Sequence, residues 1–170
     1  MTGLCFVDAN VLVYTFDPRN PAKHQRATAW RDLLWQRGVG RTSAQVLSET
    51  YVVLRRLRRD VPAEVLWERV ADYFAWNPQP VDADLMRRAR EIEQRWKISW
   101  WDATIVAAAQ VQGCELLLTE DLQDGMAFGG VTVRSPFTLA AEQPAAPYAA
   151  PPMLARLHRP RGRPRRAARA

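Results

Sequence analysis

The stretch SWWDATIVAAAQVQGCELLLTEDLQDG, residues 99–125, decides the fold class. Ser99 is a favourable helix N-cap and Gly113 a favourable stop, so an apolar helix is predicted from Ser99 through Gln112. The run ELLLT, residues 115–119, is short and apolar, which predicts a buried strand that ends in an acidic turn. A helix that leads into a short apolar strand is typical of α/β domains.

The rest of the chain repeats this alternation. Further strands are predicted at 4–8, 39–42 and 131–134, and helices at 10–16, 22–37, 43–59, 61–76 and 82–96. The segment Asn77-Pro78-Gln79-Pro80 breaks the helical pattern. Short strands alternating with helices imply an α/β domain with a mainly parallel sheet, whose ligand sites form at the carboxyl ends of the strands. Asp8 and Asp121 both stand just past such strand ends.

The positive charge of the chain is concentrated at one end. The net charge is +6. Residues 138–170 hold seven arginines and one acid, Glu142, and so account for all of it, while residues 1–137 hold 17 basic and 17 acidic groups. We therefore expect a neutral folded domain over 1–137 and a basic, Ala/Pro/Arg-rich, disordered tail over 138–170. The tail could add RNA affinity that weakens with salt, contact a partner, or be passive.

Composition excludes several classes of protein. Cys5 and Cys114 lie in apolar runs, which favours buried thiols over a disulfide, and no Cys/His cluster indicates zinc. No apolar run is long enough to span a membrane, and the N-terminus does not resemble an export signal. We expect a cytoplasmic protein with no membrane partner.

Four acids occur where an apolar segment meets a turn or a helix start. They are Asp8 in FVDAN, Glu49 in SAQVLSET, Asp102 in SWWDAT and Asp121 in LLTEDL. Carboxylates brought close together repel each other until a cation arrives, and Mg²⁺ and Mn²⁺ prefer such oxygen ligands. A divalent cation site is one interpretation of the four.

Each acid taken alone also has a structural interpretation. Asp8 could cap the following helix, and Asp102 could pair with Ser99 in a capping box. Glu49 could be an exposed helix charge, and Asp121 a turn residue. For any single residue the structural interpretation is the commoner one.

The segments FVDANVLVY, QVLSETYVVL and SWWDATIVAAAQVQGCELLLTEDLQDG resemble the PIN-domain family, and within it the VapC-type toxins of toxin–antitoxin pairs. The resemblance covers about residues 3–137. It implies a three-layer α/β/α sandwich and cleavage of RNA with Mg²⁺ or Mn²⁺ held by Asp8, Glu49, Asp102 and Asp121. Asn10 and Thr119 match polar positions that support the acids.

The resemblance predicts a metal-dependent endoribonuclease that acts as the toxin of such a pair. It implies a small antitoxin protein as partner, and a homodimer. Two alternatives remain open at this point. One is a PIN nuclease for RNA maturation or decay that has no antitoxin, and the other is an RNA-binding module without catalysis. Trp100 and Trp101 flank Asp102, so one of them is expected to be exposed near the substrate.

Overall fold

The structure, a computed structural model, describes residues 3–139. The predicted basic tail therefore lies outside the described residues, apart from its first two positions. Five strands form one sheet, in which β4 runs antiparallel at one edge and the other strands are parallel. In sheet order they are β2 (Gly40–Arg41), β1 (Cys5–Val7), β3 (Leu116–Leu118), β5 (Val131–Arg134) and β4 (Ala127–Phe128).

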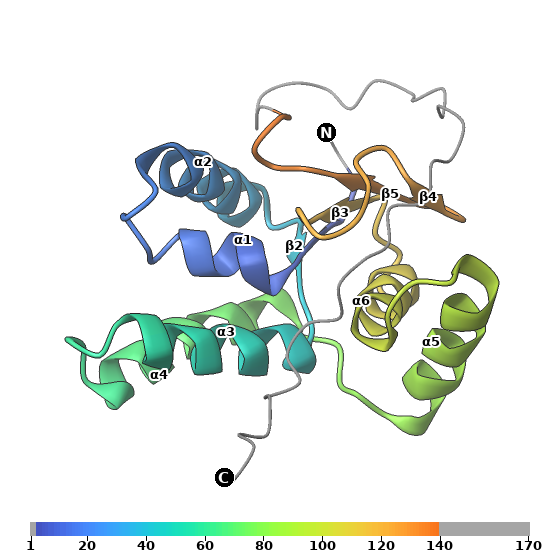
Figure 1. Ribbon diagram of the computed structural model, residues 1–170, viewed down its shortest axis with the longest axis horizontal. Coiled ribbons are helices and arrows are strands. Elements are labelled where there is room, and N and C mark those ends of the chain that lie inside the picture. The colour runs from blue at the N-terminus through green and yellow to red at the C-terminus, as the bar shows by residue number, and fades with distance from the viewer. Residues whose placement is uncertain (1–2, 140–170) are drawn as a thin grey trace, which may run out of the picture.

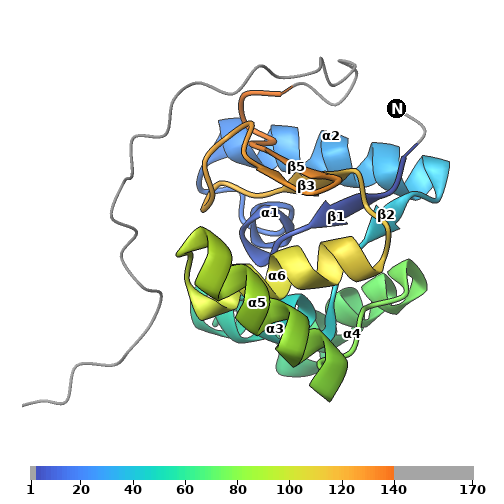
Figure 2. The same ribbon diagram turned by 90° about the vertical axis from the view of Figure 1, so that its right-hand side faces the viewer.

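Helices cover both faces of this sheet, which confirms the predicted α/β/α arrangement. Helix α2 lies on one side and α6 on the other, with α5 packed outside α6 (Figures 1 and 2). The helices among residues 3–139 are α1 (Ala9–Tyr14), α2 (Pro21–Arg37), α3 (Ala44–Leu57), α4 (Ala63–Ala71), the 3-10 helix η1 (Asp72–Trp76), α5 (Ala83–Trp96) and α6 (Trp100–Val111).

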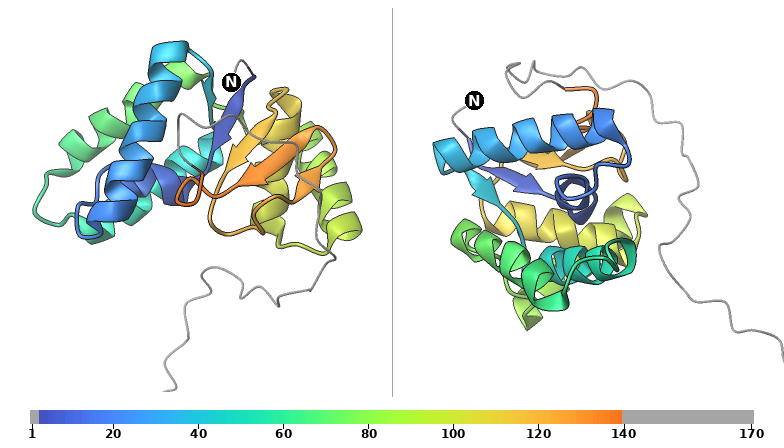
Figure 3. Two further views of the ribbon diagram at one scale, coloured as in Figure 1. Left: turned by 90° about the horizontal axis from the view of Figure 1, so that it is seen from above. Right: turned by 90° about the vertical axis from the view of Figure 1, so that its left-hand side faces the viewer.

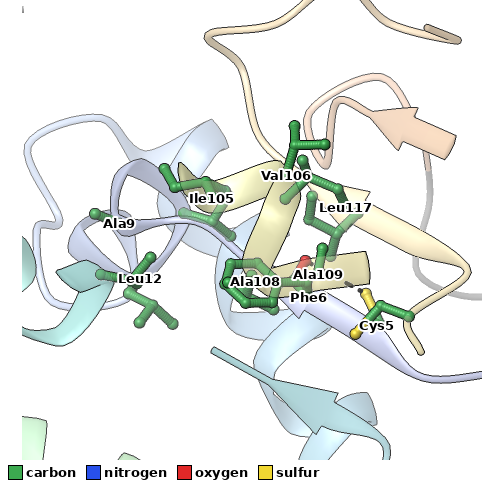
Figure 4. Packing of buried hydrophobic residues seen from close by; sticks show 14 of the residues in the cluster. Cys5, Phe6, Ala9, Leu12, Ile105, Val106, Ala108, Ala109 and Leu117 are labelled. Carbon is green, nitrogen blue, oxygen red and sulfur yellow. Dashed lines mark hydrogen bonds between the residues drawn. The ribbon is translucent and has the colours of Figure 1, made fainter. Parts of the chain in front are cut away.

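The core forms where α6 meets the central strands. Every residue of β1 and β3 is buried, as expected for parallel strands that are covered on both faces. Phe6 and Leu117 belong to the same buried cluster as Ala108 and Ala109 of α6 (Figure 4). Small alanine side chains let the helix backbone approach the sheet closely, so α6 and its Asp102 have little freedom to shift.

The predicted helix starts are confirmed by their hydrogen bonds. The side chains of Ser43, Asp82 and Ser99 accept hydrogen bonds from the backbone N–H groups three residues further on, at 3.2, 2.8 and 3.1 Å. Gly38 ends α2 with a φ of 65°, a left-handed conformation that favours glycine.

Some predicted bounds were wrong. The strand predicted over 39–42 is only Gly40–Arg41, and the helix predicted over 61–76 tightens into the 3-10 helix η1 after Ala71. The edge strand β4 was not predicted. It has only two residues, and a periodicity of two cannot be recognised over so short a segment.

Both cysteines are buried free thiols, as predicted. Burial raises the pKa of Cys114 to about 12 and the pKa of Cys5 well above its usual value, with Cys114 nearby adding to the shift at Cys5. The thiols therefore stay protonated near neutral pH and are poor nucleophiles. None of the helices within residues 3–139 has the length and apolar character needed to cross a membrane.

We predict that Gly40→Ala destabilises the fold. A Cβ at this position would lie 2.6 Å from the indole ring of Trp76, which is itself buried. Such overpacking typically costs about 1–3 kcal/mol, which urea unfolding would measure. Gly130→Ala is the matched control, because nothing lies within 4 Å of a Cβ there. Equal losses of unfolding free energy in both variants would contradict the close contact between Gly40 of β2 and Trp76.

Candidate active site

The carboxyl edge of the sheet brings two of the predicted acids, Asp8 and Asp121, close together. β1 ends at Val7 and leads directly into α1, which lies between α2 and α3 (Figure 3). α6 is joined to β3 by the short turn at 112–115 and so runs back against the strand, which puts its N-terminus at this same edge. Asp8, Asp102 and Asp121 therefore all belong to one edge, and α3, which carries Glu49, begins there after β2.

Asp8 is 1% exposed and fully engaged. Its Oδ1 accepts a hydrogen bond from the N–H of Ala9 at 2.6 Å, so it does cap α1. Its Oδ2 accepts from Thr119 Oγ1 at 2.7 Å and from Asn10 Nδ2 at 2.9 Å. The N–H of Asp8 donates to the carbonyl of Leu118 at 3.1 Å. The Asp8 side chain thus both caps α1 and binds Thr119, the residue after β3, and these bonds fix its orientation.

The amide of Asn10 joins the two strand-end acids. Its Nδ2 lies 2.9 Å from Asp8 Oδ2, 2.6 Å from Asp121 Oδ2 and 3.0 Å from Thr119 Oγ1. An amide nitrogen carries only two hydrogens, so three oxygens compete for two donors. The carboxylates of Asp8 and Asp121, 113 positions apart in the chain, therefore face one small volume.

The hydroxyl of Thr119 holds the turn that carries Asp121. Thr119 is buried, donates to Asp8, and accepts from Asn10 and, at 3.1 Å, from the N–H of Asp121. One donor and two acceptor positions are all that a hydroxyl offers. The turn after β3 is thus tied to β1 through a single oxygen.

Asp102 and Glu49 lie on separate helices. Asp102 is 3% exposed, and its Oδ2 accepts from Ser99 Oγ at 2.7 Å, while its N–H donates back to the same oxygen at 3.1 Å. Asp102 and Ser99 therefore do pair at the start of α6. The Asp102 carboxylate accepts from the hydroxyl of Ser99, whereas in a standard capping box it would accept from the backbone N–H. The N-terminus of α6 also favours a negative charge. Glu49 is half-buried on α3, which packs against α1.

The donor set fits a hard divalent cation by its chemistry. Carboxylate and amide oxygens are the preferred ligands of Mg²⁺ and Mn²⁺. Asn10 Oδ1 is buried and has no hydrogen-bond partner among the described residues, which is uncommon and is often explained by an ion or water. Over residues 3–139, no three Asp, Glu, His or Cys side chains already form a group that could hold a metal ion.

Two neighbouring acids have ionic partners. Glu120 pairs with Lys23 of α2, and Asp124 accepts from Arg134 Nε at 3.1 Å and from the N–H of Ser135 at 2.8 Å. Sequence reasoning missed Lys23 altogether, because no spacing rule links residues 97 positions apart.

The tryptophans beside Asp102 differ in exposure. Trp101 is 50% exposed, whereas Trp100 is less exposed and packs against the hydrophobic core. The prediction that one of the two would be exposed is confirmed, and the exposed residue, Trp101, directly precedes Asp102.

The fold defines a class of protein, an α/β domain with carboxylates at the carboxyl edge of a mainly parallel sheet. A family model, the PIN domain, matches residues 5–123. The chain belongs to the PIN domain family, as its sequence predicted.

Two solved structures are similar to this chain. One is VapC20 of Mycobacterium tuberculosis, described as a sarcin–ricin loop cleaving toxin, at 27% identity and a TM-score of 0.53, covering 66% of this chain and 86% of that one. The other is a toxin–antitoxin complex from Klebsiella pneumoniae, at 22% identity and a TM-score of 0.55, covering 78% and 97%. The resemblance to VapC-type toxins is thereby confirmed. No curated protein matches the chain.

We predict that Thr119→Val lowers the free energy of unfolding by about 1–3 kcal/mol, because a buried carboxylate and a backbone N–H each lose a partner while the shape is kept. Urea unfolding would measure the loss. Thr138→Val is the matched control, since Thr138 is exposed and its hydroxyl donates a long, 3.3 Å hydrogen bond to the carbonyl of Ser135. A Thr119→Val variant as stable as the control would contradict the role of this hydroxyl.

Proposed function

We propose that this protein is a metal-dependent endoribonuclease and the toxin of a toxin–antitoxin pair. The observation that carries the proposal is the pair of carboxylates, Asp8 and Asp121, held around Asn10 at the carboxyl edge of a PIN domain. The similarity to VapC20, a sarcin–ricin loop cleaving toxin, supports RNA as the substrate.

Asp8, Glu49, Asp102 and Asp121 are the residues that would hold Mg²⁺ or Mn²⁺. When bound, such an ion supplies a more acidic water and neutralises charge on a phosphate. Asn10 and Thr119 keep Asp8 and Asp121 in one orientation through the bonds described above, so the carboxylates need little rearrangement to bind a cation.

The four acids would have different tasks. Asp8 and Asp102 are nearly fully buried, so they serve as fixed ligands. Asp121 and Glu49 are half-buried and are therefore closer to solvent and to an incoming RNA strand. Glu49 is the residue that would orient the attacking water or complete the ligand set. The attack breaks one backbone phosphodiester bond and adds the elements of water across it.

The antitoxin partner is proposed on the likeness to the Klebsiella pneumoniae toxin–antitoxin complex. Such a partner would be a small protein that covers the acidic edge and so blocks RNA. The homodimer and the cytoplasmic location stay predictions from the sequence.

We predict that purified protein cuts a mixed RNA pool with Mg²⁺ or Mn²⁺ and does not cut it in EDTA. Asp8→Asn and Asp102→Asn should each lower the cutting rate by at least about 100-fold, because each loses a charged ligand while keeping its shape. Asp32→Asn, which removes an exposed acid paired with Arg31 on α2, is the matched control and should cut normally.

The rival functions give different results in this assay. Equal cutting by wild type and Asp8→Asn would contradict the assigned site. Tight RNA binding without cutting under any metal condition would favour a binding module instead. Metal-dependent cutting that is not inhibited by adding a small protein encoded next to this one would favour a role in RNA maturation or decay.

A further inference from the structure

A lysine stands beside the acidic site in an unusual environment. Lys23 Nζ forms an ion pair with Glu120 and donates a hydrogen bond to Tyr14 Oη at 3.1 Å. The same nitrogen is 4.7 Å from the centre of the Tyr14 ring and 4.8 Å from the centre of the Phe137 ring, and these two rings meet edge to face. Two aromatic rings and one carboxylate therefore hold the ammonium in place.

This lysine is close to the proposed metal ligands by two routes. Glu120, its ionic partner, directly precedes Asp121. Tyr14 follows Asn10 by four positions on α1, so the two side chains lie on the same helix face, about 6 Å apart along the axis. Asn10 contacts Asp121 and Tyr14 contacts Lys23. The cation therefore lies roughly one helical turn from the acids, along the same edge.

Lys23 is charged and accessible. Burial lowers its pKa, but the bonds to Glu120 and Tyr14 outweigh that effect, and the pKa is raised above its usual value. Its side chain is 30% exposed and that of Glu120 is 28% exposed. Residues 1–137 have no net charge, so RNA approaching the four acids meets no general positive field from the domain. A cation fixed beside the acids would supply local attraction.

We infer that Lys23 is a substrate-binding residue that contacts an RNA phosphate neighbouring the cleaved one, and that Glu120 competes with this phosphate for the ammonium. The inference rests on the proposed nuclease function. The aromatic rings of Tyr14 and Phe137 keep the ammonium in position while its anionic partner changes from carboxylate to phosphate. A purely structural lysine, one that only ties α2 to the turn after β3, is the rival explanation.

The test measures binding of a fluorescent 12-nucleotide single-stranded RNA of mixed sequence as a function of salt. Ca²⁺ replaces Mg²⁺ to suppress cutting, and the RNA is checked to be intact. Lys23→Gln is expected to weaken binding and to reduce the slope of log K against log salt by about 0.7, the value for one phosphate contact on a single strand. Lys23→Arg should keep the slope. Arg87→Gln removes a 71% exposed cation near the start of the outer helix α5, where it pairs with Asp84, and is the matched control that should leave the slope unchanged.

Glu120→Gln separates the two explanations. If Lys23 binds phosphate, removing the competing carboxylate should tighten RNA binding at low salt. If Lys23 only links α2 to the turn after β3, Lys23→Gln and Glu120→Gln should have the same effect on RNA binding. The salt slope of Lys23→Gln would then equal that of wild type, which would overturn the inference. RNA binding by wild type with an unchanged slope in Lys23→Gln contradicts only the lysine assignment. Absence of RNA binding by wild type contradicts the nuclease function and this assignment together.

Discussion

The hydrogen bonds of the Asn10 amide are the interaction on which the rest of the site depends. One nitrogen contacts the carboxylates of Asp8 and Asp121 and the hydroxyl of Thr119. Like charges this close are costly, and the amide and hydroxyl donors offset that cost without adding a positive charge. The carboxylates therefore remain able to bind a metal cation. An arginine or lysine in place of Asn10 would instead compete with that cation.

The fold explains why these groups meet. β1 and β3 are parallel neighbours with Val7 opposite Leu118, so the residues that follow each strand leave the sheet side by side. The alanine-rich α6 packs on those strands and runs against them, which brings Asp102 to the same edge. Lys23 joins from α2 on the other face of the sheet. The edge thus combines acids at its centre with one fixed cation beside them.

The sequence predicted what depends on local patterns. Asp8 and Asp121 were placed at strand ends because apolar runs stop there, and Ser99 was recognised as an N-cap with Asp102 three positions on. The two-residue strand β4 could not be predicted, since it is too short to show a periodicity. The contact of Lys23 with Glu120 depends on how α2 packs against the turn after β3, and no local pattern encodes that packing.

The most direct test of the central claim is calorimetric titration of the full chain with Mn²⁺, which requires neither an RNA target nor activity. We expect Mn²⁺ to bind wild type and to bind more than about tenfold more weakly to Asp8→Asn and to Asp121→Asn. Asp84→Asn, at an exposed acid of α5 paired with Arg87, should bind Mn²⁺ as wild type does. No Mn²⁺ uptake by wild type, or equal uptake by all four proteins, would contradict the assignment of these acids as a metal site.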